Sequence, residues 1–171
     1  RAMPGPRFGI HGIRKIMKIP KRPLLGTIIK PKLGLDAASH AKVAFDAWSG
    51  GIDLVKDDEN LTSTKFNNFE ERVLKTLDAL DYVESVVGEK KAYMPNVTAQ
   101  YDEMLKRAEF VVDHGGKYVM VDIVTCGWSA VQQLREDLHD RVAIHAHRAG
   151  HAAFTKNPKH GISMLVVAKL A

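Results

Sequence analysis

The alternation of short apolar runs with longer amphipathic segments restricts the fold of this chain more than any other feature. The expected strands occupy residues 24–29, 52–56, 92–96, 118–124 and 142–147. Segments with the apolar spacing of helices lie at about 37–49, 69–87, 101–114, 129–138 and 162–171. Strands with apolar centres that are joined by helices favour parallel β/α units, whose sheet is covered on both faces.

Local signals support the helix boundaries. Asp36 is a good N-cap for the first of these helices, whose apolar stripe stops at the glycine pair 50–51. Glu71 and Lys75 have the spacing of an ion pair on the surface of the second helix.

Two folds are built from such units, an open doubly wound sheet and a (β/α)8 barrel. An open sheet that binds a dinucleotide has a glycine-rich turn after its first strand, whereas residues 30–34 here read KPKLG. Reactive polar residues instead follow all five strands, as in a barrel. A whole barrel has eight units and typically ~250 residues, so these 171 residues predict an α/β fold that is a partial (β/α)8 TIM barrel of about five units.

The expected domain organisation is a lead-in segment over residues 1–22 and the N-terminal part of a barrel domain over 23–171. Residues 1–35 contain nine Lys or Arg and no acidic residue, whereas the rest of the chain has more acidic than basic residues. A basic arm can bind nucleic acid, but this one has Phe8 as its single aromatic residue. A solvated lead-in with two lysines for an anionic ligand is the simpler interpretation, and no nucleic-acid partner is expected.

Composition indicates a cytoplasmic location without a membrane partner. No run approaches the ~18 apolar residues of a membrane helix, and no secretion leader is recognisable. Cys126 is the single cysteine, which excludes an internal disulfide and fits a reducing compartment.

The strongest candidate for chemistry is the segment GGIDLVKDDEN at 50–60. Side chains alternate along a strand, so Lys56 and Asp58 point the same way and Glu59 lies on the turn beyond. Two carboxylates are suited to Mg²⁺, which prefers oxygen ligands, and a lysine becomes a ligand only if its neutral amine adds CO2 to form a carbamate. A solvated acidic loop whose lysine balances charge explains the segment equally well.

Two further groups stand at strand ends. His145 and His147 share one face of the fifth strand and suit acid–base chemistry, while Arg148 offers a planar fork for phosphate. The same His-x-His pattern also occurs at zinc sites and in hydrogen-bonded cores.

Lys30 and Lys32 flank a proline after the first strand and suit an oxyanion or phosphate, although two surface lysines in a loop are as common a reading. Asn96 and Asp122 stand at equivalent strand ends and are candidate hydrogen-bond partners for the site.

These segments together resemble the large subunit of ribulose-1,5-bisphosphate carboxylase/oxygenase (RuBisCO). The resembling stretches are LLGTIIKPKLGL (24–35), GGIDLVKDDEN (50–60), NVTA (96–99) and HAHRAGHA (145–152), in the order and at the separations of that family. The residues of the first stretch, at 24–35, and the basic lead-in resemble archaeal, form III members more than plant ones.

The resemblance implies roles for seven residues. Lys56, carbamylated by an activator CO2, would bind Mg²⁺ together with Asp58 and Glu59, while Asp57 would not be a ligand. Catalytic roles would fall to Lys30, His147 and the Lys56 carbamate, and substrate contacts to Lys32 and Arg148.

The implied reaction is the carboxylation and oxygenation of ribulose 1,5-bisphosphate, which gives 3-phosphoglycerate and makes the protein a lyase and a monooxygenase. It would begin when the Lys56 carbamate takes the C3 proton, and CO2 or O2 would then attack the Mg²⁺-stabilised enediolate. A homodimer or higher homo-oligomer with shared active sites is also implied. The family's remaining parts would precede Arg1 and follow Ala171, so the segment alone is expected to be poorly folded and inactive.

Rival functions remain. A RuBisCO-like protein would use the same barrel to enolise a sulfur-containing sugar phosphate, but such proteins commonly lose several of the substrate-contacting residues retained here. An amidohydrolase with a carbamylated lysine would carry its His-x-His on the first strand, and here that pattern is on the fifth.

Overall fold

The computed structural model describes residues 5–171, so residues 1–4 of the expected lead-in lie outside the described part. Its strands are β1 (Gly26–Ile28), β2 (Leu54–Lys56), β3 (Ala92–Met94), β4 (Tyr118–Asp122) and β5 (Ala143–His147). The helices that connect them are α2 (Ala37–Ser49), α3 (Phe69–Val87), α4 (Tyr101–Asp113) and α6 (Trp128–Leu138). The predicted α/β class with parallel strands is therefore confirmed.

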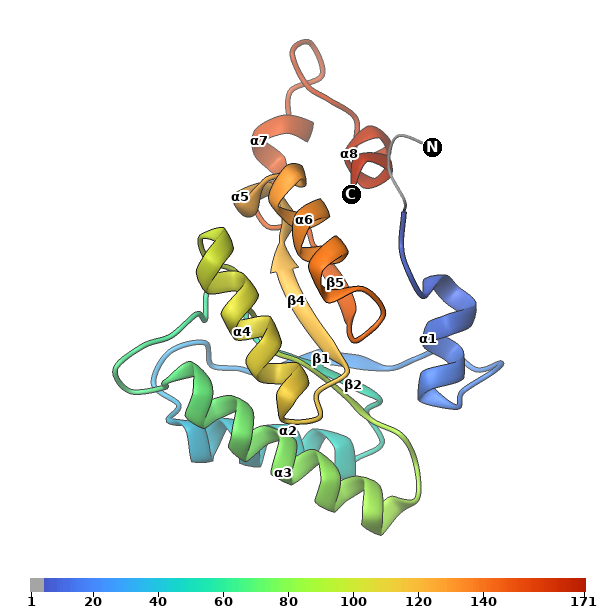
Figure 1. Ribbon diagram of the computed structural model, residues 1–171, viewed down its shortest axis with the longest axis vertical. Helices are drawn as coiled ribbons and strands as arrows, with labels where there is room; N and C mark the ends of the chain where they lie inside the picture. The colour runs from blue at the N-terminus through green and yellow to red at the C-terminus, as the bar shows by residue number, and fades with distance from the viewer. Residues whose placement is uncertain (1–4) are drawn as a thin grey trace.

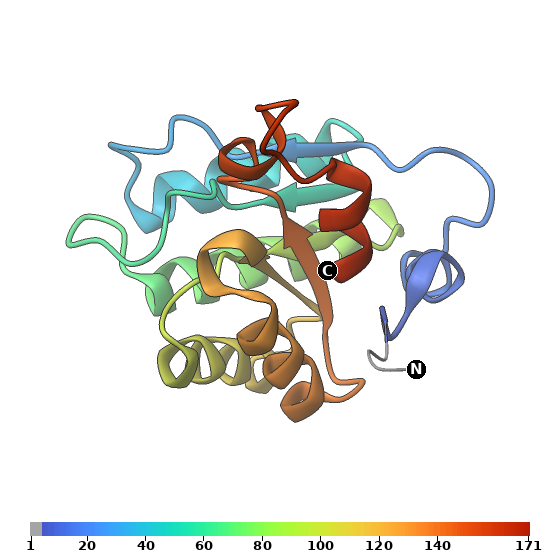
Figure 2. The same ribbon diagram turned by 90° about the horizontal axis from the view of Figure 1, so that it is seen from above.

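All strand pairs are parallel and follow the order of the chain. β1, β2 and β3 form one sheet, and β4 pairs with β5 in a second. An isolated bridge between Asn96 and Met120 joins the two sheets. Helices α2, α3, α4 and α6 lie along one side of the strands (Figures 1 and 2). Since the strands are parallel and in register, their carboxyl ends lie at the same edge.

The main core lies between the strands and these helices. Trp48, Val55, Val73, Val119 and Leu134 are completely buried there. Each comes from a different helix or strand, so burial of apolar surface holds every unit to its neighbours.

Capping side chains fix the starts of two helices. Asp36 accepts a hydrogen bond from the backbone N–H of Ser39 and caps α2, as predicted. Asn68 caps α3 in the same way through Glu71 N–H, which the sequence analysis did not foresee. The predicted Glu71–Lys75 ion pair is present at 3.6 Å.

The prediction of a solvated lead-in is wrong for the described residues. Helix α1 (Gly9–Met17) precedes β1, and Met17 is only 1% exposed. It packs in a second core with Ala92, Met94 and Met120 from β3 and β4. The physical reason is that Ile13, Ile16 and Met17 have helical spacing, which gives this basic segment an apolar face.

Other differences concern element ends. The fourth strand stops at Asp122, and a short helix α5 (Ile123–Cys126) follows where the strand was expected to continue. A second short helix, α7 (Ala152–Thr155), was not expected, whereas the final helix α8 (Met164–Leu170) lies within the predicted range. Among residues 5–171 no helix combines the length and the apolar character that crossing a bilayer demands.

Candidate active site

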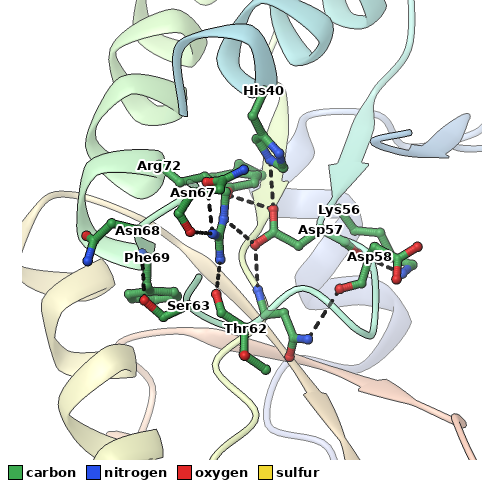
Figure 3. A network of polar contacts seen from close by, with 12 residues as sticks. His40, Lys56, Asp57, Asp58, Thr62, Ser63, Asn67, Asn68, Phe69 and Arg72 are labelled. Carbon is green, nitrogen blue, oxygen red and sulfur yellow. Dashed lines mark hydrogen bonds and ion pairs between the residues drawn. The ribbon is translucent and has the colours of Figure 1, made fainter. Parts of the chain in front are cut away.

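The end of β2 carries the centre of the candidate site. Alternation along the strand separates the side chains of Lys56 and Asp58 from that of Asp57 between them, which points toward His40 and Arg72 (Figure 3). The Lys56 ammonium donates to the Asp57 carbonyl oxygen at 2.9 Å and lies 3.6 Å from Glu59 Oε2. The predicted gathering of this lysine with its downstream acids is therefore observed.

Asp58 joins β1 to β2. Its buried carboxylate accepts from the Lys30 ammonium and from the backbone and side chain of Asn60, at 2.9 and 3.1 Å. Burial would raise the pKa of Asp58, but Lys30 and Asn60 together lower it below its usual value, so the group is anionic at neutral pH. The hydrogen bond from Lys30 to Asp58 likewise raises the pKa of that lysine.

Glu59 presents an unsatisfied oxygen. Within the described residues its Oε2 is buried without a hydrogen-bond partner. The nearest basic groups are Lys56 Nζ at 3.6 Å and His147 Nε2 at 4.0 Å. A hydrogen bond from its own backbone lowers the pKa of Glu59, so the carboxylate is ionised. A buried anionic oxygen of this kind calls for a partner, and a hard cation would supply one.

His147 reaches the same place from β5. Its Nδ1 lies 3.0 Å from Asp122 Oδ1, which fixes the ring so that Nε2 faces Glu59. Burial raises the pKa of Asp122. His145 lies beside it on the predicted face, with ring centroids 6.2 Å apart, and burial followed by Lys56 and His147 lowers the pKa of His145.

Asn96, just after β3, holds the turn that carries Asp58 and Glu59, here called the acidic turn. Its side-chain amide donates to the carbonyl oxygens of Asp58 and Glu59 at 3.3 and 3.0 Å. The expected roles of Asn96 and Asp122 as hydrogen-bond partners of the site are thus confirmed.

The structure brings together five of the seven predicted site residues, here called the strand-end cluster: Lys30, Lys56, Asp58, Glu59 and His147. Lys32 and Arg148 are exposed, and no hydrogen bond or ion pair in the described part of the chain joins either to the cluster. Arg148 instead lies 2.5 Å from His151 Nε2.

Sequence reasoning missed the surroundings of Asp57. This carboxylate is completely buried and receives hydrogen bonds from His40, Arg72, Tyr93 and Asn96. Burial acts to raise the pKa of Asp57, but Arg72, His40 and Asn96 outweigh it and lower the pKa to about 2. The available signal was the presence of His40 and Arg72 on the buried faces of two amphipathic helices.

Across residues 5–171, no three His, Cys, Asp or Glu side chains form a ready metal site. The strand-end cluster offers two carboxylates, Asp58 and Glu59, with the Lys56 amine beside them. Oxygen donors of this charge suit a hard divalent cation if a third anionic ligand is supplied.

Parallel β/α units whose reactive side chains meet at the carboxyl ends of the strands define an α/β enzyme domain. The chain belongs to the family described as ribulose bisphosphate carboxylase large chain, catalytic domain, whose model matches residues 9–171.

Several similar proteins are carboxylases of archaea. The ribulose bisphosphate carboxylase of Methanocaldococcus jannaschii is 59% identical over 170 residues, which are 99% of this chain and 40% of that protein. A dimeric archaeal Rubisco from Hyperthermus butylicus matches with a TM-score of 0.95 at 51% identity, over 98% of this chain and 40% of that one. The octameric Rubisco from Pyrococcus horikoshii, solved with sulfate, gives a TM-score of 0.94 at 55% identity. The match covers 96% of this chain and 39% of that one.

The fold is also shared with a rubisco-like protein from Burkholderia fungorum, at a TM-score of 0.90 and 33% identity over 96% of this chain and 41% of that one. The chain spans about 40% of the length of the curated relative described above.

Proposed function

We propose that the protein containing this chain carboxylates and oxygenates ribulose 1,5-bisphosphate and gives 3-phosphoglycerate. The observation that carries the proposal is the strand-end cluster, in which Lys30, Lys56, Asp58, Glu59 and His147 converge from β1, β2 and β5. Membership of the carboxylase family and similarity to archaeal carboxylases along the whole chain support it.

The corresponding fold is a (β/α)8 barrel of which β1 to β5 are about the first five units. Residues 23–171 would form the N-terminal part of the barrel domain and residues 1–22 its lead-in. The parallel strands in chain order and the similarity to Rubisco structures support this assignment.

The cofactor would be Mg²⁺, held by Asp58, Glu59 and Lys56 once the Lys56 amine has reacted with an activator CO2 to form a carbamate. The unpartnered Glu59 Oε2, 3.6 Å from Lys56 Nζ, fits such a cation. When bound, Mg²⁺ supplies a Lewis acid that polarises substrate oxygens. Carbamylation turns a competing positive charge into the missing anionic ligand.

The residues of the chain would divide the remaining work. Lys56, once carbamylated, would supply the base for the C3 proton, and Lys30, which donates a hydrogen bond to Asp58, would donate and accept protons. His147, oriented by Asp122, presents Nε2 to the reacting centre. Lys32 and Arg148, exposed and unattached to the cluster, would contact substrate, Arg148 through a phosphate.

The partners would be ribulose 1,5-bisphosphate, CO2 and O2, and further copies of the same protein in a homodimer or larger homo-oligomer. Support comes from similar structures that are described as dimeric and octameric.

The test is incorporation of radiolabelled CO2 into acid-stable product by the full-length protein with ribulose bisphosphate. We expect Lys56→Ala to lower the rate by roughly 10²-fold or more, because the general base is lost. Lys65→Ala is the matched control, since Lys65 is exposed on the loop beyond the turn, and its rate should equal that of wild type. Undiminished incorporation by Lys56→Ala would exclude the proposed role.

An assay of the wild-type full-length protein distinguishes carboxylation from the rival, rubisco-like function. Because a rubisco-like protein shares this fold, the fold alone does not separate the two activities. Enolisation of a sulfur-containing sugar phosphate by a wild-type protein that incorporates no CO2 would favour the rubisco-like function.

A further inference from the structure

The Asp57 network consists of Asp57 and its four hydrogen-bond donors, His40, Arg72, Tyr93 and Asn96. Figure 3 shows His40 and Arg72 on the side of Asp57 that is turned away from Lys56 and Asp58. Asp57 Oδ1 accepts from His40 Nε2 at 3.0 Å and from the Tyr93 hydroxyl at 2.8 Å. Its Oδ2 accepts from Arg72 Nε at 3.1 Å and from Asn96 N–H at 3.0 Å. Both oxygens are therefore saturated, and the carboxylate has one permitted orientation.

These donors come from separate elements of the fold. His40 is on α2, Arg72 on α3, Tyr93 on β3 and Asn96 just after β3. The backbone of Asp57 is also fixed, because its N–H donates to Met94 O at 3.1 Å and its carbonyl accepts the Lys56 ammonium. One buried side chain thus ties β2 to two helices and the next strand.

Arg72 extends the network around the loop that follows the turn. Its guanidinium also donates to Thr62 O at 2.7 Å and to Asn67 O and Oδ1 at 3.2 and 3.1 Å. Because Arg72 is completely buried, these bonds and the Asp57 ion pair satisfy a charge that could not stand alone. Arg72 therefore holds the chain on both sides of the acidic turn, through Asp57 before it and Thr62 after it.

We propose that Asp57 is a positioning residue, which through Arg72, Tyr93 and Asn96 fixes the acidic turn so that Asp58 and Glu59 are presented together to a divalent cation. The inference rests on the proposed function, since it concerns the residues that support the proposed ligands. Supporting groups of this kind commonly change metal affinity by 10–100-fold when they are mutated.

Asp53 offers a matched control on the same strand region. Its side chain is as buried as that of Asp57 and is paired with an arginine, at 2.6 and 2.7 Å from Arg22. Arg22 is 46% exposed, whereas Arg72 is buried, and Asp53 precedes β2 instead of following it. Asp53→Asn therefore removes a buried carboxylate that is paired with an arginine, without touching the acidic turn.

The experiment measures Mn²⁺ binding to the full-length protein by electron paramagnetic resonance in bicarbonate buffer, together with the thermal midpoint of each variant. We expect both Asp57→Asn and Asp53→Asn to lower the midpoint. Only Asp57→Asn should weaken Mn²⁺ binding, by roughly tenfold or more, and change the shape of the bound signal. Equal Mn²⁺ affinity in the two variants would overturn the positioning role.

If Asp57→Asn does not fold, the milder variant Tyr93→Phe tests whether Asp57 positions the acidic turn. Tyr93→Phe removes one hydrogen bond to Asp57 and leaves the Asp57–Arg72 charge pair intact. We expect its Mn²⁺ affinity to fall by about threefold or more, whereas an affinity equal to that of Asp53→Asn would overturn the proposal. Failure of the wild-type protein to bind Mn²⁺ would instead defeat the proposed function itself.

Discussion

The three consecutive acidic residues after β2, Asp57, Asp58 and Glu59, have different surroundings because side chains alternate along a strand. Asp57 faces the helices and accepts hydrogen bonds from four donors, whereas Asp58 and Glu59 belong to the strand-end cluster. Alternation along a strand, applied to the sequence, predicted that Lys56 and Asp58 share a side. The partners of Asp57 could not be predicted, because His40, Arg72 and Tyr93 are distant in sequence and meet only through tertiary packing.

The Asp57 network predicts a dependence of stability on pH. The folded-state pKa of Asp57 is about 2, below its ordinary 3.8, so the stabilisation is complete above pH 4–5 and is lost as pH falls toward 2. We expect the difference in unfolding free energy between wild type and Asp57→Asn to shrink by about 2 kcal/mol across that range. Urea denaturation of the full-length proteins at stepped pH measures this, and a constant difference would contradict it.

At the scale of elements, the order and type of the five strands and the helices between them followed from apolar spacing. Element ends were less predictable: β4 stops at Asp122 because the chain turns into α5. Helix α1 was not predicted, because its basic residues indicate a solvated segment, whereas Ile13, Ile16 and Met17 form an apolar face on one side of the helix. The partners of that face come from distant strands, chiefly β3 and β4, with Ala143 of β5 in the same core.

Helix α1 should contribute to stability through Met17. Because this side chain is 1% exposed and contacts the second core, we expect Met17→Ala in the full-length protein to lower the unfolding free energy by about 2–5 kcal/mol. Ile10→Ala, at a position 75% exposed on the same helix, is the control and should change it by less than about 0.5 kcal/mol. Similar losses in the two variants would show that α1 does not pack as described.

At the scale of the whole molecule, the strand-end cluster joins residues separated by more than a hundred positions, from Lys30 to His147. Parallel strands bring them together because every carboxyl end lies at one edge. The sequence therefore predicted the meeting of these side chains, but not the isolation of Lys32 and Arg148. The chain spans about 40% of the length of the Methanocaldococcus jannaschii relative.

In the proposed function the amine of Lys56 becomes an anionic metal ligand, and carbon-13 NMR of the full-length protein tests this conversion most directly. In ¹³C-bicarbonate with Mg²⁺, wild type should show a protein-bound carbamate resonance that weakens when Mg²⁺ is removed and is absent from Lys56→Ala. A carbamate resonance of equal intensity in Lys56→Ala, or none in a wild-type protein that fixes CO2, would contradict the claim.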